Sequence, residues 1–172
     1  MEWDNSTYED QTATAWHEAG HAVVGFALGG KVESVQLGGE ADDFLPERFG
    51  DCVVNWGPVL AGSDWQRQRE VMTVLAGPVG EMLYLQELLD PRMMPPWQYD
   101  WQLALQLSES LVPDLSRRVP WLGALLNELY QRMDQEPLRS AVAAVADDLL
   151  THEHLESEQL AEVIGFWLRR AS

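Results

Sequence analysis

The hydrophobic positions of the chain form one apolar segment, two short β-branched segments and a series of helical patterns. Residues 12–28 are apolar on nearly every side, which is typical of a buried helix, and Gly29-Gly30 supplies the residues favoured after a helix C-terminus. The segments Val32–Leu37 and Asp51–Trp56 have the composition of short strands. The first third of the chain therefore predicts a buried helix followed by a small sheet.

The rest of the chain predicts helices. The pattern from Trp65 to Leu89 is helical, and Pro78 should kink or split this helix because proline lacks a backbone donor. Loops are expected at Gly38–Phe49 and Asp90–Gln98. Further helices, punctuated by Pro113, Pro120 and Pro137, are expected at Tyr99–Leu111, Trp121–Asp134, Leu138–Leu150 and Glu156–Arg170. We expect a mostly α (α+β) fold with a small β-sheet beside the first helix. We also expect residues 1–172 to form one domain, with residues 1–10 as a flexible N-terminal segment.

Composition and charge narrow the classes of function. The chain has 172 residues, of which 46% are hydrophobic, enough for a single domain with a core. Its net charge of −17, with Lys31 as the only lysine, argues against nucleic acid and against anionic membrane surfaces as partners. No segment has the length of a membrane span, and the acidic N-terminus is unlike a signal peptide. We expect a soluble, cytoplasmic protein without direct membrane insertion.

The sequence HEAGH at His17–His21 carries the most specific chemistry. One helical turn separates His17 from His21, so both imidazoles project from one face and can share a metal ion. Glu18 lies beside such a site, where it can act on a water molecule, and the HExxH pattern indicates Zn²⁺. Polar groups on a buried helix need partners, and a metal ion provides them. The alternative is a pair of core histidines hydrogen-bonded to carbonyl groups.

A catalytic zinc ion usually has three protein ligands, so a third ligand is needed. The candidates are Glu81, Asp100, His152 and His154. Asp100 opens a predicted helix, where the helix dipole favours a carboxylate for other reasons. Glu81 follows small residues that permit tight helix packing, and the two histidines lie in a polar segment between helices. Spacing alone does not decide between Glu81 and Asp100.

Four segments resemble, in the same order, the peptidase domain of the FtsH family of ATP-dependent zinc metalloproteases. The first, ATAWHEAGHAVVGFALGGKVESVQL, carries the HExxH motif and a Val-rich strand, and it is highly specific. The others are VMTVLAGPVGEMLY, YDWQLALQLSESLV and AVADDLLTHEHLESEQLAEVI. Together they cover residues 10–166. The resemblance implies a helical zinc-peptidase domain of this kind.

The resemblance also implies roles for particular residues. The aspartate that opens the third segment is the family's third zinc ligand, which corresponds to Asp100. The acid of the second segment corresponds to Glu81, expected beside the site, where it orients a ligand histidine or packs against it. The family's substrate-side strand corresponds to Asp51–Trp56, so we expect its central residues to bind an extended polypeptide substrate. These are Val53, Val54 and Asn55.

The chain departs from the family in its organisation and in two motifs. From these residues we expect a peptidase domain without the transmembrane helices and the ATPase module that precede it in FtsH proteins. The family's approach to the aspartate is replaced by MMPPWQYD, and its GGR by AGP. From this new segment we expect apolar walls near the aspartate. They would be formed by Met93, Met94, Trp97 and Trp101.

Two functions from different classes follow. The first is an ATP-independent zinc metalloendopeptidase that cleaves unfolded or flexible polypeptides, with Glu18 as general base. The second is a non-proteolytic regulatory or binding module that keeps the metal site and acts with a full-length FtsH-type membrane protease or a separate ATPase. The intact Glu18 favours catalysis, and the missing ATPase module favours the second function. The oligomeric state stays open.

Overall fold

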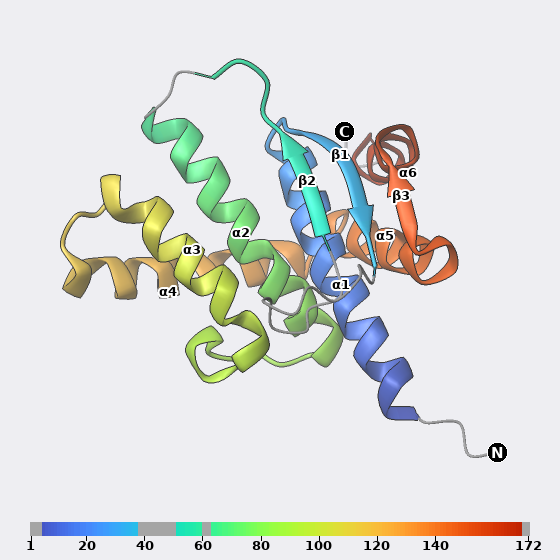
Figure 1. Cartoon of the computed structure of the whole chain (residues 1–172), viewed down its shortest axis with the longest axis horizontal. Coiled ribbons are helices and arrows are strands. Elements are labelled where there is room, and N and C mark those ends of the chain that lie inside the picture. Colours follow the sequence, from blue (N-terminus) through green and yellow to red (C-terminus); the bar gives the residue numbers. More distant parts are fainter. Residues whose placement is uncertain (1–4, 38–50, 60–62, 170–172) are drawn as a thin grey trace, which may run out of the picture.

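Two long antiparallel helices, α1 (Asn5–Ala27) and α2 (Asp64–Leu85), make the most extensive contact of the fold (Figure 1). The computed structural model describes residues 5–37, 51–59 and 63–169. Helix α2 begins at a capped end, because the Ser63 hydroxyl accepts a hydrogen bond from the Gln66 backbone N–H at 3.1 Å. The other face of α1 packs against α5 (Leu138–His152), so α1 is covered on two sides.

The backbones of α1 and α2 approach closely at two glycines. A Cβ atom on Gly20 would lie 2.1 Å from the carbonyl oxygen of Ala76, and one on Gly80 would lie 2.3 Å from that of Trp16. Neither distance is possible for a real side chain. Glycine at both positions is therefore a condition for the close contact between the two helices.

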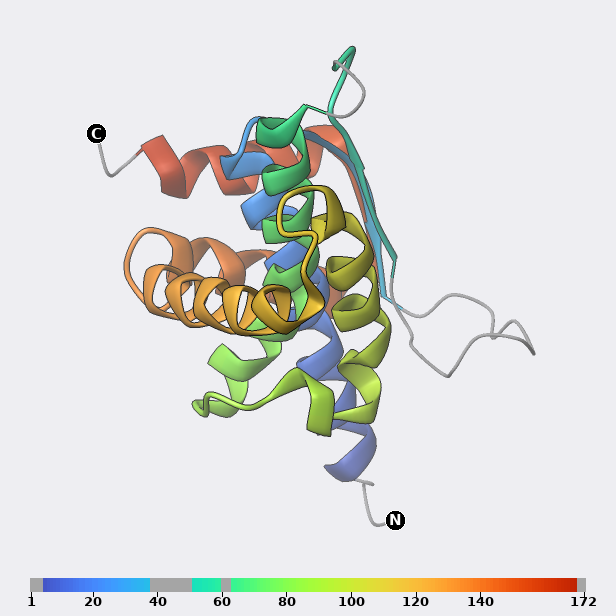
Figure 2. The same ribbon diagram turned by 90° about the vertical axis from the view of Figure 1, so that its left-hand side faces the viewer.

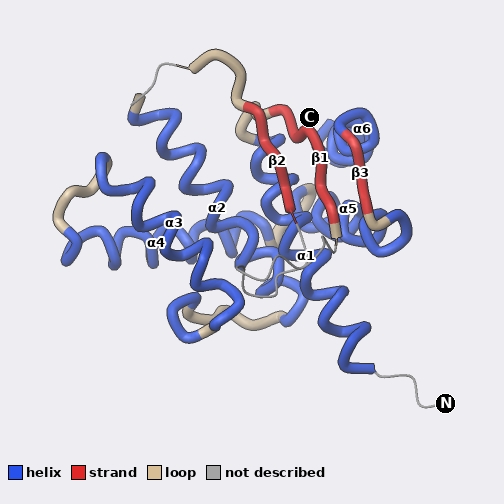
Figure 3. The backbone as a smooth tube through the Cα atoms, viewed as in Figure 1, coloured by secondary structure: helices blue, strands red, loops and turns tan. Residues whose placement is uncertain are grey.

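The strands form one antiparallel sheet in the order β2-β1-β3 (Figure 3). Strands β1 (Lys31–Gln36) and β2 (Asp51–Asn55) agree with the predicted pair. Strand β3 (His154–Glu156) was not predicted, because its three residues are too few to show a strand pattern, and its pairing with β1 defines it. Strand β2 lies at an edge, and no other described strand pairs with it on its outer side.

The remaining helices pack around α1 and α2 on one side of the sheet, which is seen edge-on in Figure 2. They are α3 (Gln98–Leu107), α4 (Leu115–Met133), α5 and α6 (Ser157–Arg169), with 3₁₀ turns at Pro91–Met93, Pro95–Trp97 and Ser108–Ser110. The apolar residues of β1 are buried between the sheet and the helices, with Val35 opposite Leu155 of β3. A mostly α fold with a small sheet beside the first helix is thus confirmed. None of the described helices is long and apolar enough to cross a membrane.

Some element boundaries differ from the prediction. Helix α2 is not split at Pro78, which is buried inside it. Helix α4 begins at Leu115, well before Trp121, because the Asp114 carboxylate caps it by accepting from the Ser116 backbone N–H at 3.0 Å. Helix α1 begins at Asn5, within the segment expected to be flexible. The loop expected at Gly38–Phe49 lies outside the described residues.

The contact between α1 and α2 predicts opposite effects for two glycine-to-alanine substitutions. Gly20→Ala should lower the free energy of unfolding by about 1–3 kcal/mol, because the new methyl group overlaps the Ala76 carbonyl oxygen. Gly123→Ala, in α4, should raise it by about 0.5–1 kcal/mol, since nothing lies within 4 Å of the new atom and alanine favours the helix. Urea unfolding measures both. A Gly20→Ala protein as stable as the parent would contradict the close contact.

Candidate metal centre

Helices α1 and α2 each present residues at four-residue spacing along the face where they meet. On α1 these are His17 and His21, and on α2 they are Thr73, Gly77 and Glu81. Residues four apart lie on one side of a helix, so each imidazole faces a row of α2 residues. Because the helices run antiparallel, His17 lies near Glu81, and His21 lies near Thr73.

The partners on α2 determine which imidazole nitrogens carry hydrogen. The Nδ1 atom of His17 lies 3.1 Å from Glu81 Oε2, and that of His21 lies 2.8 Å from the Thr73 carbonyl oxygen. A carboxylate and a carbonyl oxygen can only accept, so both Nδ1 atoms donate. In the neutral form of each ring, the free lone pair is therefore on Nε2, the atom that can bind a metal ion.

Asp100, in the first turn of α3, completes a group of three ligand atoms. Its Oδ2 lies 2.8 Å from His17 Nε2 and 3.6 Å from His21 Nε2. The three ligand atoms all lie within 4.8 Å of one another. Among the described residues, no other group of three or more histidine, cysteine or acidic side chains converges in this way. The group can hold a metal ion through two nitrogens and one oxygen.

Three acceptor atoms facing one another require a cation or added protons between them. The pKa of His21 is raised to about 9: burial lowers it, but the charge and hydrogen bond of Asp100 outweigh the burial, with smaller contributions from Glu18 and the Thr73 carbonyl. The pKa of Asp100 is held well below its usual range, because the two imidazoles outweigh the opposing effect of burial. The site therefore attracts positive charge, either as protons or as a metal ion.

Gly77 allows the two imidazoles to lie close to α2. A Cβ atom there would lie 2.2 Å from Nε2 and 2.4 Å from Cε1 of His21, and 2.8 Å from His17 Nε2. A side chain at this position would therefore overlap the ring of His21 and crowd that of His17. The donor set of two imidazoles and one carboxylate fits a zinc ion.

The structure separates the four candidates for the third ligand. Asp100 faces the Nε2 atoms, whereas Glu81 contacts the opposite nitrogen of His17 and lies outside the group of three. His152 and His154 are exposed, at the end of α5 and in β3, and do not belong to the group. Glu18 is buried, and its charge acts on His21, so its carboxylate lies beside the site without being one of the three atoms.

Of the residues expected as apolar walls near Asp100, the two tryptophans are buried. Trp97 is 0% exposed and Trp101 is 5% exposed, so neither offers a surface to a substrate, whereas Met93 is exposed. The indole Nε1–H of Trp97 instead donates to Glu81 Oε2 at 2.6 Å. A tryptophan close to a predicted ligand was visible in the sequence, but its direction depends on the packing of α3 against α2.

The residues expected to bind substrate lie on the edge strand β2. Val53 is exposed, and Val54 packs towards α1, since a Cβ on Gly25 would lie 3.1 Å from its side chain. The Asn55 side chain donates to Glu33 of β1 at 3.0 Å and accepts from the Gly57 backbone N–H at 2.8 Å. Val54 and Asn55 can therefore serve a substrate through their backbone groups rather than through their side chains.

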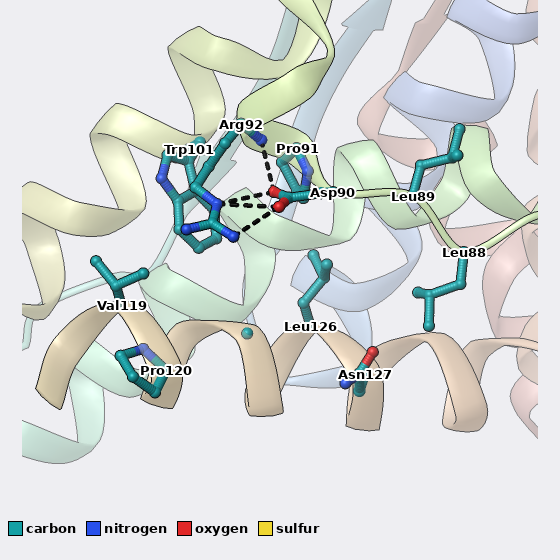
Figure 4. A pocket seen from close by; sticks show the side chains of 11 residues that line it. Leu88, Leu89, Asp90, Pro91, Arg92, Trp101, Val119, Pro120, Leu126 and Asn127 are labelled. Carbon is teal, nitrogen blue, oxygen red and sulfur yellow. Dashed lines mark hydrogen bonds and ion pairs between the residues drawn. The ribbon is translucent and has the colours of Figure 1, made fainter.

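A separate open cavity of about 430 Å³ lies between α4 and the segment that joins α2 to α3 (Figure 4). It is lined by Trp101, by Leu126 and Asn127 of α4, and by the ion pair of Asp90 with Arg92 at 2.7 Å. Trp101 follows Asp100 in α3, and adjacent helical residues point about 100° apart. The cavity therefore lies on another side of α3 from the histidines, and none of the candidate metal ligands lines it.

No protein-family model matches the chain, and no curated protein matches it either. Membership of the FtsH family therefore remains a proposal.

The raised pKa of His21 predicts how the metal-free protein responds to pH. A protonated His21 stabilises the fold fully below its unfolded pKa of about 6.5, and this stabilisation is lost as pH rises through about 9. The melting temperature of chelator-treated protein should therefore fall between pH 6.5 and 9. His21→Asn should remove most of this slope, and His154→Ala should leave it unchanged. Zinc affinity should instead rise over the same pH range, by up to about tenfold per pH unit, because zinc binding displaces one proton from His21.

The close approach of Gly77 to both imidazoles predicts that Gly77→Ala loses metal binding but keeps its fold. In Gly77→Ala the methyl group overlaps both Nε2 atoms, so the imidazoles must move apart, and zinc affinity should fall at least about tenfold. Gly123→Ala is the matched control, because its methyl group meets nothing within 4 Å. Competition with a zinc-binding dye measures the affinity. Equal affinity in the two variants would argue against a metal ion at this position.

Proposed function

We propose that the protein is a zinc-dependent endopeptidase that hydrolyses unfolded or flexible polypeptides. The observation that carries the proposal is the group of His17, His21 and Asp100 next to the buried Glu18. Three protein ligands leave a coordination position open, which is typical of catalytic rather than structural zinc sites. A structural site also has no need of a carboxylate beside the ligands.

In this proposal the residues of the chain have distinct tasks. A bound zinc ion supplies Lewis-acid chemistry, by which it acidifies water and polarises a peptide carbonyl group. The Glu18 carboxylate takes a proton from the attacking water and gives it to the leaving amine. Glu81 and the Thr73 carbonyl hold the two imidazoles by their Nδ1–H groups, which keeps both Nε2 atoms directed at the metal position.

The edge of β2 supports a polypeptide substrate in extended form. Its outer side is not paired with any described strand, and β2 lies against α1. Val54 packs against Gly25, which is one helical turn beyond His21. An extended segment can add to such an edge through backbone hydrogen bonds, which are independent of sequence. Unfolded or flexible chains present such segments most readily, so they are the proposed substrates.

The likeness to the FtsH peptidase domain also belongs to this proposal. The ligand set of two histidines and a distant aspartate, with the glutamate of the second motif against one histidine, agrees with the roles that the resemblance implies. A helical domain with a small antiparallel sheet beside the HExxH helix is compatible with it.

The test is the Glu18→Gln variant, which keeps the size of the side chain and removes the base. It should bind zinc like the parent but cleave unfolded casein at least about 100-fold more slowly. Glu158→Gln, at the exposed start of α6, should cleave at the parental rate. Zinc content and cleavage rate are measured on the same samples, with a chelator-treated control.

Two results would argue against the proposal. If Glu18→Gln cleaved as fast as the parent, Glu18 would not be the base. If the zinc-loaded parent cleaved no unfolded polypeptide, the non-proteolytic module would be the better interpretation of the same site.

A further inference from the structure

The segment before Asp100 contributes a hydrogen-bond donor to the metal centre. The Trp97 side chain is completely buried, and its Nε1–H donates to Glu81 Oε2 at 2.6 Å. The same oxygen accepts from His17 Nδ1 at 3.1 Å. An oxygen held by two donors has less freedom than one held by a single donor. The indole therefore restricts the position from which Glu81 holds His17.

The same tryptophan fixes the start of the helix that carries Asp100. Trp97 ends the 3₁₀ turn Pro95–Trp97, its backbone N–H donates to the Met94 carbonyl at 2.9 Å, and α3 begins at the next residue. Asp100 follows three residues later, in the first turn of α3. The bond between the indole and Glu81 thus ties this turn of α3 to α2.

We propose that Trp97 is a positioning residue that couples both sides of the metal centre. His17 contacts Asp100 through Nε2 and Glu81 through Nδ1, while Trp97 joins Glu81 to the turn of α3 that carries Asp100. These contacts form a closed ring through three helices. Trp97 touches neither metal nor substrate. The inference rests on the proposed function only in taking the group to be a metal site, and it does not require peptide cleavage.

Removing the hydrogen-bond partner of a metal ligand lowers the affinity for the metal ion, so zinc affinity can test the role of Trp97. Trp97→Phe keeps an aromatic ring in the same buried place and removes the N–H donor. It should raise the zinc dissociation constant about 10–100-fold, the range found for outer partners of ligand histidines. Trp101→Phe is the matched control: Trp101 is also buried in this region, but it lines the cavity on another side of α3.

The control separates positioning from packing. Both substitutions remove packing area, so both should lower the melting temperature of the metal-free protein, but Trp101→Phe should change zinc affinity less than about threefold. If the two variants bound zinc equally well, Trp97 would have no positioning role.

A double-mutant cycle with Glu81→Leu, which removes the acceptor, tests the route of the effect. If Trp97 acts through Glu81, Trp97→Phe should change zinc affinity far less in the Glu81→Leu background than in the parent. If the two substitutions changed the zinc dissociation constant by independent factors, Trp97 would not act through Glu81.

Should Trp97→Phe fail to fold, nuclear magnetic resonance of the parent replaces it. The assigned indole N–H resonance of Trp97 should shift on zinc addition more than that of Trp101. A Trp97 resonance that does not respond to zinc would overturn the proposal.

These measurements keep the two proposals apart. A parent that binds zinc without cleaving polypeptides leaves the role of Trp97 to be decided by the affinities, while the peptidase proposal fails. A parent that binds no zinc overturns both. Equal zinc affinities for Trp97→Phe and Trp101→Phe overturn the role of Trp97 alone.

Discussion

At Gly20 and Gly80 the backbones of α1 and α2 meet with no side chain between them. Helix pairs usually pack with their axes about 8–10 Å apart, at a distance set by the side chains in the contact. Glycines allow the short end of this range, and the imidazoles of α1 can then reach Thr73 and Glu81 on α2. The packing of the core and the orientation of the histidines thus depend on the same short distance.

The charges around the histidines favour a cation at the centre of the site. Two imidazoles are surrounded by the carboxylates of Asp100, Glu81 and Glu18, in a region that is largely removed from solvent. Burial weakens the screening of these charges by water, so their attraction for a cation exceeds that of the same groups on the surface. The chain itself carries a net charge of −17, and the negative long-range field of this charge also attracts cations.

The local parts of the site could be predicted from residue spacing, and the parts made by tertiary packing could not, so the expectations for Asp100 and Glu81 came only from the family resemblance. His17, Glu18 and His21 share one helix, so their spacing fixes their relative directions. Spacing left Glu81 and Asp100 undecided because each reaches a different nitrogen of the same imidazole from a different helix.

Other differences have similar causes. The interpretation of Trp97 as a substrate wall was wrong, since composition cannot show that an aromatic residue points inward. Strand β3 exists only through its pairing with β1. The early start of α4 could have been predicted, because Asp114 followed by Ser116 is a recognisable N-cap.

The candidate ligands of the site are divided unequally along the chain. Two come from neighbouring turns of α1, and Asp100 lies 83 residues beyond His17. A metal ion held by all three would close a long loop, and the entropy lost by the unfolded chain grows with the logarithm of that length. Such an ion would act as a reversible cross-link. Local detachment of α3 from α1 would leave only two ligands in place, so release of the ion would require this one helix to open rather than the whole domain to unfold.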